Sequence, residues 1–137
     1  MEGGGVISHV LDTCALLDLA AGRWTDRVAR RELAAARRPV ILSVAVWEIA
    51  RKFRLGKLQL PCEQAGILDF VGEICLRHQI AIESLNPQIC HAAELLPPHH
   101  EDPFDRMVLA MAIQAQCPIF TTDKRFRDYP VRVIAQY

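Results

Sequence analysis

Acidic residues at the ends of short apolar runs are the part of this sequence best suited to chemistry. Asp12 directly follows the run 6–11, and Asp123 comes shortly after the run 118–121. In open parallel α/β sheets, ligands bind beyond the carboxyl ends of the strands. If both runs are strands of such a sheet, their two carboxylates are predicted to share one crevice. For either aspartate alone, a role as helix N-cap or turn former stays open.

Two further segments place acids near helix starts. Glu48 lies six residues beyond the run 40–42, on a stretch with helical apolar spacing that Ser43 could cap. It is predicted to face the same crevice, although the exposed face of an amphipathic helix is an open alternative. Asp102 before Pro103 is typical of an N-cap followed by proline, which makes Asp105 the third helical residue. A carboxylate at that position is held ionised and can still coordinate a cation.

Clustered carboxylates repel one another and repel phosphate, so the pattern makes physical sense only with a bound cation. Oxygen-rich sites suit magnesium or manganese. His99 and His100 follow two prolines and are expected on a surface loop. The five cysteines have neither finger nor ribbon spacing, so we expect reduced, buried thiols, with a zinc site built from cysteines and histidines not excluded.

The elements that must position these acids alternate between short apolar runs and helical periods, which indicates an α/β domain with a parallel sheet. The expected strands are all short and apolar, as in doubly covered sheets: 6–11, 40–42, 80–82, 118–121 and 131–134. Helices are predicted along an apolar stripe over 67–75, after Ser43 and after Pro103, with further starts at Pro61 and Pro87 and ends at Gly56 and 97–98. Residues 1–5 are predicted to form a flexible tail and 6–137 a single domain.

Composition limits the classes of function. The chain has 137 residues, of which 51% are hydrophobic, and its formal net charge is zero, so no global field attracts nucleic acid. Basic residues instead gather locally in 51–57 and 124–127, where solvated surface is an equally good interpretation. No apolar stretch approaches the roughly 20 residues of a membrane span. The start lacks the regions of a signal peptide, so we expect a cytoplasmic protein.

Four blocks of this sequence resemble the PIN domain, in particular the VapC-type toxins of toxin–antitoxin operons. They are LDTCALL (11–17), SVAVWEIARK (43–52), HEDPFDRMVLA (100–110) and FTTDKRF (120–126). The blocks follow the order of that family, and the match that they define spans nearly the whole chain. Cys14 is the visible departure, and it puts no catalytic position in doubt.

The resemblance implies a PIN-like three-layer α/β/α sandwich around a mainly parallel five-stranded sheet. It also implies a metal-dependent endoribonuclease with one or two Mg²⁺ or Mn²⁺ ions bound by Asp12, Glu48, Asp105 and Asp123. Asp12 and Asp105 are the best candidates for primary ligands. Supporting contacts around the metal site are expected from Thr13, Ser43, Asp102 and Thr122. Contacts with RNA phosphates are expected from Arg51, Lys52, Arg106, Lys124 and Arg125.

The implied partners are RNA, a small antitoxin encoded nearby and a second copy of the chain. The apolar face around Trp47, Phe53 and Leu55 could dock the antitoxin, although Trp47 is expected in the core. Two other functions remain possible. One is a phosphatase with Asp12 as nucleophile, although Cys14 stands where the haloacid-dehalogenase pattern has a second aspartate. The other is a PIN fold that binds or assembles without catalysis.

Overall fold

The sheet has five short strands in the computed structural model, which describes residues 5–137. The strands are β1 (His9–Leu11), β2 (Pro39–Leu42), β3 (Ala81–Glu83), β4 (Ile119–Phe120) and β5 (Val133–Ile134). Their order is β3-β2-β1-β4-β5, and each neighbouring pair is parallel. The predicted tail over 1–5 lies outside the described residues except for Gly5.

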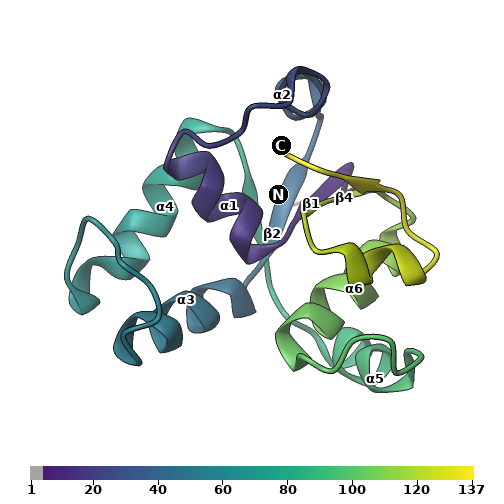
Figure 1. The fold of residues 1–137 in the computed structure, drawn as a ribbon. Coiled ribbons are helices and arrows are strands. Elements are labelled where there is room, and N and C mark those ends of the chain that lie inside the picture. The colour runs from purple at the N-terminus through teal and green to yellow at the C-terminus, as the bar shows by residue number, and fades with distance from the viewer. Residues whose placement is uncertain (1–4) are drawn as a thin grey trace.

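Helices cover both faces of this sheet, so the expected three-layer α/β/α architecture is confirmed. The α-helices are α1 (Thr13–Ala20), α2 (Arg27–Ala35), α3 (Val44–Arg54), α4 (Ile67–Arg77), α5 (Pro87–Leu95) and α6 (Pro103–Ala115). Two 3₁₀ turns, η1 (Gln64–Gly66) and η2 (Lys124–Asp128), complete the elements. In Figure 1, α1, α3 and α4 lie on one side of the strands, and α5 and α6 lie on the other. Among residues 5–137, no helix is both long and apolar enough to cross a bilayer.

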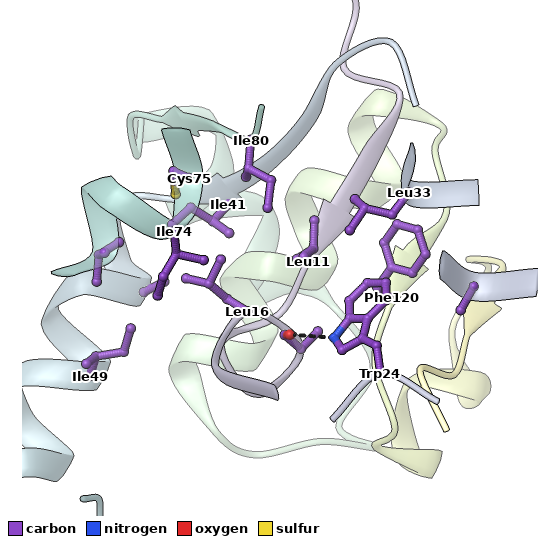
Figure 2. Packing of buried hydrophobic residues seen from close by; sticks show 14 of the residues in the cluster. Leu11, Leu16, Trp24, Leu33, Ile41, Ile49, Ile74, Cys75, Ile80 and Phe120 are labelled. Carbon is purple, nitrogen blue, oxygen red and sulfur yellow. Dashed lines mark hydrogen bonds between the residues drawn. The ribbon is translucent and has the colours of Figure 1, made fainter. Parts of the chain in front are cut away.

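The core consists of two apolar clusters, one on each face of the sheet. Successive strand residues alternate between them, so Val10 packs with α5 and α6 while Leu11 packs with α1, α3 and α4. Figure 2 shows the cluster that contains Leu11, in which Leu16, Trp24 and Phe120 also pack. The indole N–H of Trp24 donates to the carbonyl of Ala15 at 2.9 Å, which satisfies its buried polar group.

All five predicted strands form. Three are shorter than expected, since β1 and β5 contain only the last residues of the predicted runs and β4 only the central pair, whereas β2 begins one residue earlier and β3 lies one residue later. Not all are doubly covered, since the edge strand β3 leaves Ile82 42% exposed. The helices after Ser43 and Pro103 and the stripe over 67–75 are confirmed as α3, α6 and α4. Pro87 begins α5 as predicted, whereas no helix begins at Pro61. The helix that starts after Asp12 and the one over 27–35 were not predicted.

Two predictions about burial were wrong. Trp47 is 63% exposed, because its position on α3 points away from both core clusters. The cysteines are all free, as expected, but only Cys75 and Cys117 are buried, whereas Cys14 and Cys90 are exposed.

Candidate active site

The parallel sheet brings Asp12 and Asp123 to the same edge. β1 and β4 are neighbours, with Leu11 opposite Phe120, and the backbone N–H of Asp12 donates to the carbonyl of Phe120 at 3.2 Å. Both strands end near that point, where Asp12 caps α1 and Asp123 caps η2. The two acids therefore lie at one edge of the sheet, as predicted, and each also has the alternative capping role.

Asp12 is buried at the sheet edge, with 5% of its surface exposed. One carboxylate oxygen accepts from the backbone N–H of Ala15 at 2.7 Å, and the other accepts a short hydrogen bond from the Thr121 hydroxyl. Burial raises the pKa of Asp12 from 3.8 to about 6, although both hydrogen bonds oppose the change and the nearby Glu48 and Asp123 add to it. The hydroxyl that holds Asp12 thus belongs to Thr121, one residue before the predicted Thr122.

Glu48 faces the site from the second turn of α3. Its side chain is buried, which excludes the alternative that it lies on the solvent face of an amphipathic helix. The Lys52 ammonium lies one turn later on the same helix, 2.8 Å from a Glu48 carboxylate oxygen. Lys52 was predicted to hold an RNA phosphate, but in the structure its charge neutralises Glu48.

Asp102 and Asp105 occupy the start of α6 as predicted. Asp102 is the N-cap, and its carboxylate accepts from the backbone N–H of Asp105 at 3.1 Å. Burial, followed in order by the charges of Asp102, Glu48, Asp12 and Asp123, raises the pKa of Asp105 from 3.8 to about 8. The expectation that the helix start keeps Asp105 ionised was wrong for the protein without a cation, because burial and four neighbouring acids outweigh the helix terminus.

His100 is the functional residue that the sequence analysis missed. It was expected on a surface loop, yet it is only 1% exposed and packs against Phe126 at 5.4 Å between ring centroids. Its Nδ1 accepts from the backbone N–H of Asp102 at 3.3 Å, which assigns the ring hydrogen to Nε2. Nε2 lies 3.0 Å from a carboxylate oxygen of Asp105 and 3.0 Å from one of Asp123. The Nε2–H donates a hydrogen bond to Asp123 and the Asp105 carboxylate lies beside it, so His100 stands between two of the predicted metal ligands.

The sequence did contain a signal for the burial of His100, namely its position two residues before the Asp-Pro pair that begins α6. A histidine two residues before a capping Asp-Pro is held by the tight turn that the cap imposes, as the contact from Asp102 shows. Tyr129 completes its burial, because the Tyr129 hydroxyl accepts from the backbone N–H of His100 at 2.9 Å. Only the tertiary fold places Tyr129 there.

Asp123 has the opposite electrostatic environment from Asp105. Burial alone would raise the pKa of Asp123, but hydrogen bonds from Arg125 and from His100 lower it below 3.8. The Arg125 guanidinium donates from Nε at 3.1 Å and from a terminal nitrogen at 2.9 Å to the two carboxylate oxygens. Arg125 is therefore bound to Asp123 rather than free for the predicted phosphate contact.

Arg106 also differs from its prediction. Its two terminal nitrogens donate to four backbone carbonyls between the end of α5 and the start of α6, at 2.6 to 3.2 Å; the carbonyls belong to Glu94, Leu96, Pro97 and His100. These bonds use the guanidinium to fix the loop that carries His100. A phosphate contact by Arg106 does not fit this arrangement.

The remaining predicted residues surround the site in different ways. The Ser43 hydroxyl makes no capping bond and instead accepts from the backbone N–H of Leu85 at 3.0 Å, tying α3 to the segment after β3. Thr13 is buried at the first position of α1. Lys124 and Arg51 are exposed. Thr122 forms no hydrogen bond to the acids within residues 5–137.

Two overlapping groups of side chains could hold a cation. His100, Asp105 and Asp123 offer ligand atoms that all lie within 4.8 Å of one another, and so do Glu48, Asp102 and Asp105. Asp105 belongs to both groups and so stands at the centre of the site. Asp12 belongs to neither group, but it lies close enough to raise the pKa of Asp105. The oxygen-rich donor set matches hard divalent cations.

Cys14 borders the acids but does not act as a nucleophile or thiolate ligand in this environment. Although the residue is exposed as a whole, its thiol lies on the protein side, where desolvation raises its pKa to about 11 and the negative charge of Asp12 adds to the effect. The thiol therefore stays protonated at neutral pH, and the site depends on its carboxylates.

The fold and the acidic edge together define an α/β protein with a carboxylate site at the C-terminal ends of its parallel strands. The PIN domain model matches residues 9–131. The chain therefore belongs to the PIN domain family, and the resemblance noted in the sequence is confirmed. No curated protein sequence matches the chain.

Solved structures with the same fold include several toxin–antitoxin complexes. A toxin–antitoxin complex from Klebsiella pneumoniae superposes with a TM-score of 0.63 at 19% identity, over 95% of this chain and 98% of that chain. DNA-bound VapBC from Salmonella typhimurium gives 0.69 at 16% identity, over 96% and 99% of the two chains. VapBC2 from Rickettsia felis, bound to a promoter DNA fragment, gives 0.65 at 14% identity, over 94% and 98%. At these identities the likeness concerns the fold.

Proposed function

We propose that this protein is a divalent-metal-dependent endoribonuclease that acts as the toxin of a toxin–antitoxin pair in the cytoplasm. The observation that carries the proposal is the convergence of four acids from four separate elements: Asp12, Glu48, Asp105 and Asp123. Their proximity contributes to the raised pKa of Asp105, which is about 8. Membership in the PIN family supports a nuclease in general. The choice of RNA follows from the resemblance to VapC-type toxins.

Mg²⁺ or Mn²⁺ fits the residues present. Burial first, and then the charges of the neighbouring acids, raise the pKa of Asp105, and a divalent cation would offset the negative charge of these acids. Asp105, Glu48 and Asp123 would hold the cation. Asp12 would add a further negative charge close to it. A bound divalent ion supplies Lewis acidity for phosphodiester hydrolysis and lowers the pKa of water.

The protein's own side chains orient these ligands. Thr121 and the start of α1 fix both oxygens of Asp12, and Asp102 fixes the backbone at Asp105. His100 donates a hydrogen bond to Asp123 and lies 3.0 Å from a carboxylate oxygen of Asp105, so its ring sits between two acids from different elements. Such outer contacts to ligands tune metal affinity and activity by roughly 10- to 100-fold.

The test is RNA cleavage by the Asp105→Asn variant. Wild-type protein should cleave single-stranded RNA only with Mg²⁺ or Mn²⁺, and Asp105→Asn should lose this cleavage while keeping its far-UV circular dichroism. Glu101→Gln, purified in parallel, is the matched control, because Glu101 is an exposed acid just before α6, the helix that contains Asp105. Undiminished cleavage by Asp105→Asn would overturn the assignment.

The other two functions raised by the sequence make different predictions. A phosphatase with Asp12 as nucleophile should form a covalent aspartyl-phosphate, which trapping and mass spectrometry would detect. A non-catalytic PIN module should give no site-level heat when it is titrated with Mn²⁺ in a calorimeter. Stoichiometric binding that disappears in Asp105→Asn is expected instead.

We further propose a small antitoxin and a second copy of the chain as protein partners. Support comes from the fold shared with toxin–antitoxin complexes. Co-expression with the small protein encoded beside it should yield a complex that stays intact during gel filtration and has no ribonuclease activity. Failure to co-purify would contradict the antitoxin, and a purely monomeric elution volume would contradict the homodimer.

A further inference from the structure

Trp47 is a large aromatic side chain exposed next to the acidic site. It precedes Glu48 on α3, and it is 63% exposed although Glu48 is buried. Its ring contacts Phe104 edge to face, with 5.2 Å between centroids and 76° between planes. Phe104 in turn precedes Asp105 on α6. The aromatic pair therefore bridges the two helices that carry Glu48 and Asp105.

Two arginines continue from Trp47 along the same face of α3. Trp47, Arg51 and Arg54 are spaced i, i+4 and i+7, which aligns them on one side of a helix, and all three are exposed. At 1.5 Å per residue, Arg51 lies about 6 Å and Arg54 about 10 Å beyond Trp47 along the helix axis. Within residues 5–137, neither guanidinium forms an ion pair or a side-chain hydrogen bond. Lys52, between them in sequence, is instead turned inward to Glu48.

An aromatic platform followed by unpaired guanidinium groups is what single-stranded nucleic acid requires. Bases stack on aromatic rings without regard to sequence, and a row of positive charges follows the phosphates. Bases of RNA available for such stacking lie in single-stranded loops and ends. Phe104 supports the Trp47 ring from its edge, so the indole keeps its orientation while most of its surface stays accessible.

We propose that Trp47, Arg51 and Arg54 form a binding track for single-stranded RNA, in which a base beside the cleaved phosphodiester stacks on Trp47 and the adjoining phosphates contact the two arginines. The proposal rests on the ribonuclease function proposed above, and it assigns to that function a substrate-binding subsite outside the carboxylate cluster. It also identifies the substrate as unpaired at the cleavage point, since a base inside a duplex offers no free face to an indole.

Tryptophan fluorescence tests the stacking directly, because the chain has two tryptophans in different surroundings. Trp24 is buried and hydrogen-bonded, whereas Trp47 is exposed. An RNA oligonucleotide of about eight nucleotides, matching the size of small single-strand sites, is added in EDTA so that it is bound but not cleaved. Saturable quenching is expected in wild-type protein and in Trp24→Phe, with none in Trp47→Leu.

Binding constants and kinetics measure the energetic share of the track. Trp47→Leu should weaken RNA binding by about tenfold, whereas Trp47→Phe should retain most of the affinity, since stacking of one base accounts for such factors. With Mn²⁺ present, KM should rise in Trp47→Leu while kcat stays near the wild-type value. Arg51→Gln with Arg54→Gln should reduce the slope of log affinity against log salt by about 0.7 per arginine. Arg31→Gln, an exposed arginine on α2, is the matched control and should change nothing.

The outcomes separate this proposal from the proposed function. If wild-type protein cleaves RNA but Trp47 neither reports nor affects RNA binding, the track is wrong and the ribonuclease stands. If RNA quenches Trp47 but no metal permits cleavage, the ribonuclease fails and RNA binding stands. If Trp47 responds only to protein concentration or only to the co-expressed antitoxin, a protein interface covers it and the track is overturned.

Discussion

Removing the Asp105 carboxylate should stabilise the metal-free protein at high pH. Its pKa in the folded chain is about 8, against 3.8 for an unperturbed aspartate. Between these values the folded protein retains a proton that the unfolded chain has lost, so stability falls as the pH rises through the window. Each pH unit corresponds to about 1.4 kcal/mol, which gives an upper figure of about 4 kcal/mol between pH 5 and pH 8.

The side chain of Asp105 is 21% exposed, so solvent screens part of this repulsion. We therefore expect Asp105→Asn to gain about 2 kcal/mol relative to wild type between pH 5 and pH 8.5. Asp12 also titrates in this range, but it is present in both proteins and largely cancels.

Urea denaturation in EDTA at pH 5 and pH 8.5 measures this difference. Glu73→Gln serves as the control, because Glu73 is an exposed acid on α4, and it should show no pH-dependent gain. Excess Mn²⁺ should reverse the order at pH 8.5, since a bound ion stabilises wild type by RT ln(1 + [Mn²⁺]/Kd) and the variant by less. The same stability difference at both pH values would refute the argument that burial and neighbouring acids hold a proton on Asp105.

Three further predictions concern the support of the site and the core. His100→Leu should weaken Mn²⁺ binding at least about tenfold, because Asp123 loses its hydrogen bond from Nε2 and Asp105 loses the imidazole beside it, and His100→Gln, which retains a donor, should be weakened less. Equal affinities of the two variants in calorimetry would contradict a positioning role for His100. Arg106→Lys should lower the free energy of unfolding in urea by about 1 to 2 kcal/mol, because one ammonium cannot reach four carbonyls; an unchanged midpoint would mean that these bonds add nothing. Leu16→Ala should cost about 2 to 5 kcal/mol by the same measurement, since Leu16 is fully buried beside Trp24, and a smaller loss would indicate that the cluster collapses around the gap.

The placement of the acids could be predicted because it follows from local rules. A carboxylate after an apolar strand lies at the sheet edge once the strands are parallel, which is how Asp12 and Asp123 were assigned. The Asp-Pro pair fixed the start of α6 and therefore the position of Asp105. Glu48 followed from helical spacing, and its burial confirmed the choice between two faces of α3.

The partners of the charged side chains could not be predicted, because they come from segments far apart in sequence. His100 meets Asp123 across 23 residues, and the hydroxyl on Asp12 comes from Thr121 across 109. Lys52 and Arg125 were predicted to face RNA on composition alone, yet each pairs with an acid on its own element. Sequence spacing was compatible with both orientations, and the surrounding charge determined which one forms.

The carboxylate cluster thus has two origins. The sequence by itself determined which acids reach the sheet edge, since strand ends, caps and helical periods are local properties of the chain. The tertiary structure alone decided how those acids differ, because a pKa depends on burial and on charges brought together by folding. Asp105 retains a proton near pH 8 while Asp123, bound by Arg125 and His100, remains charged well below its usual range.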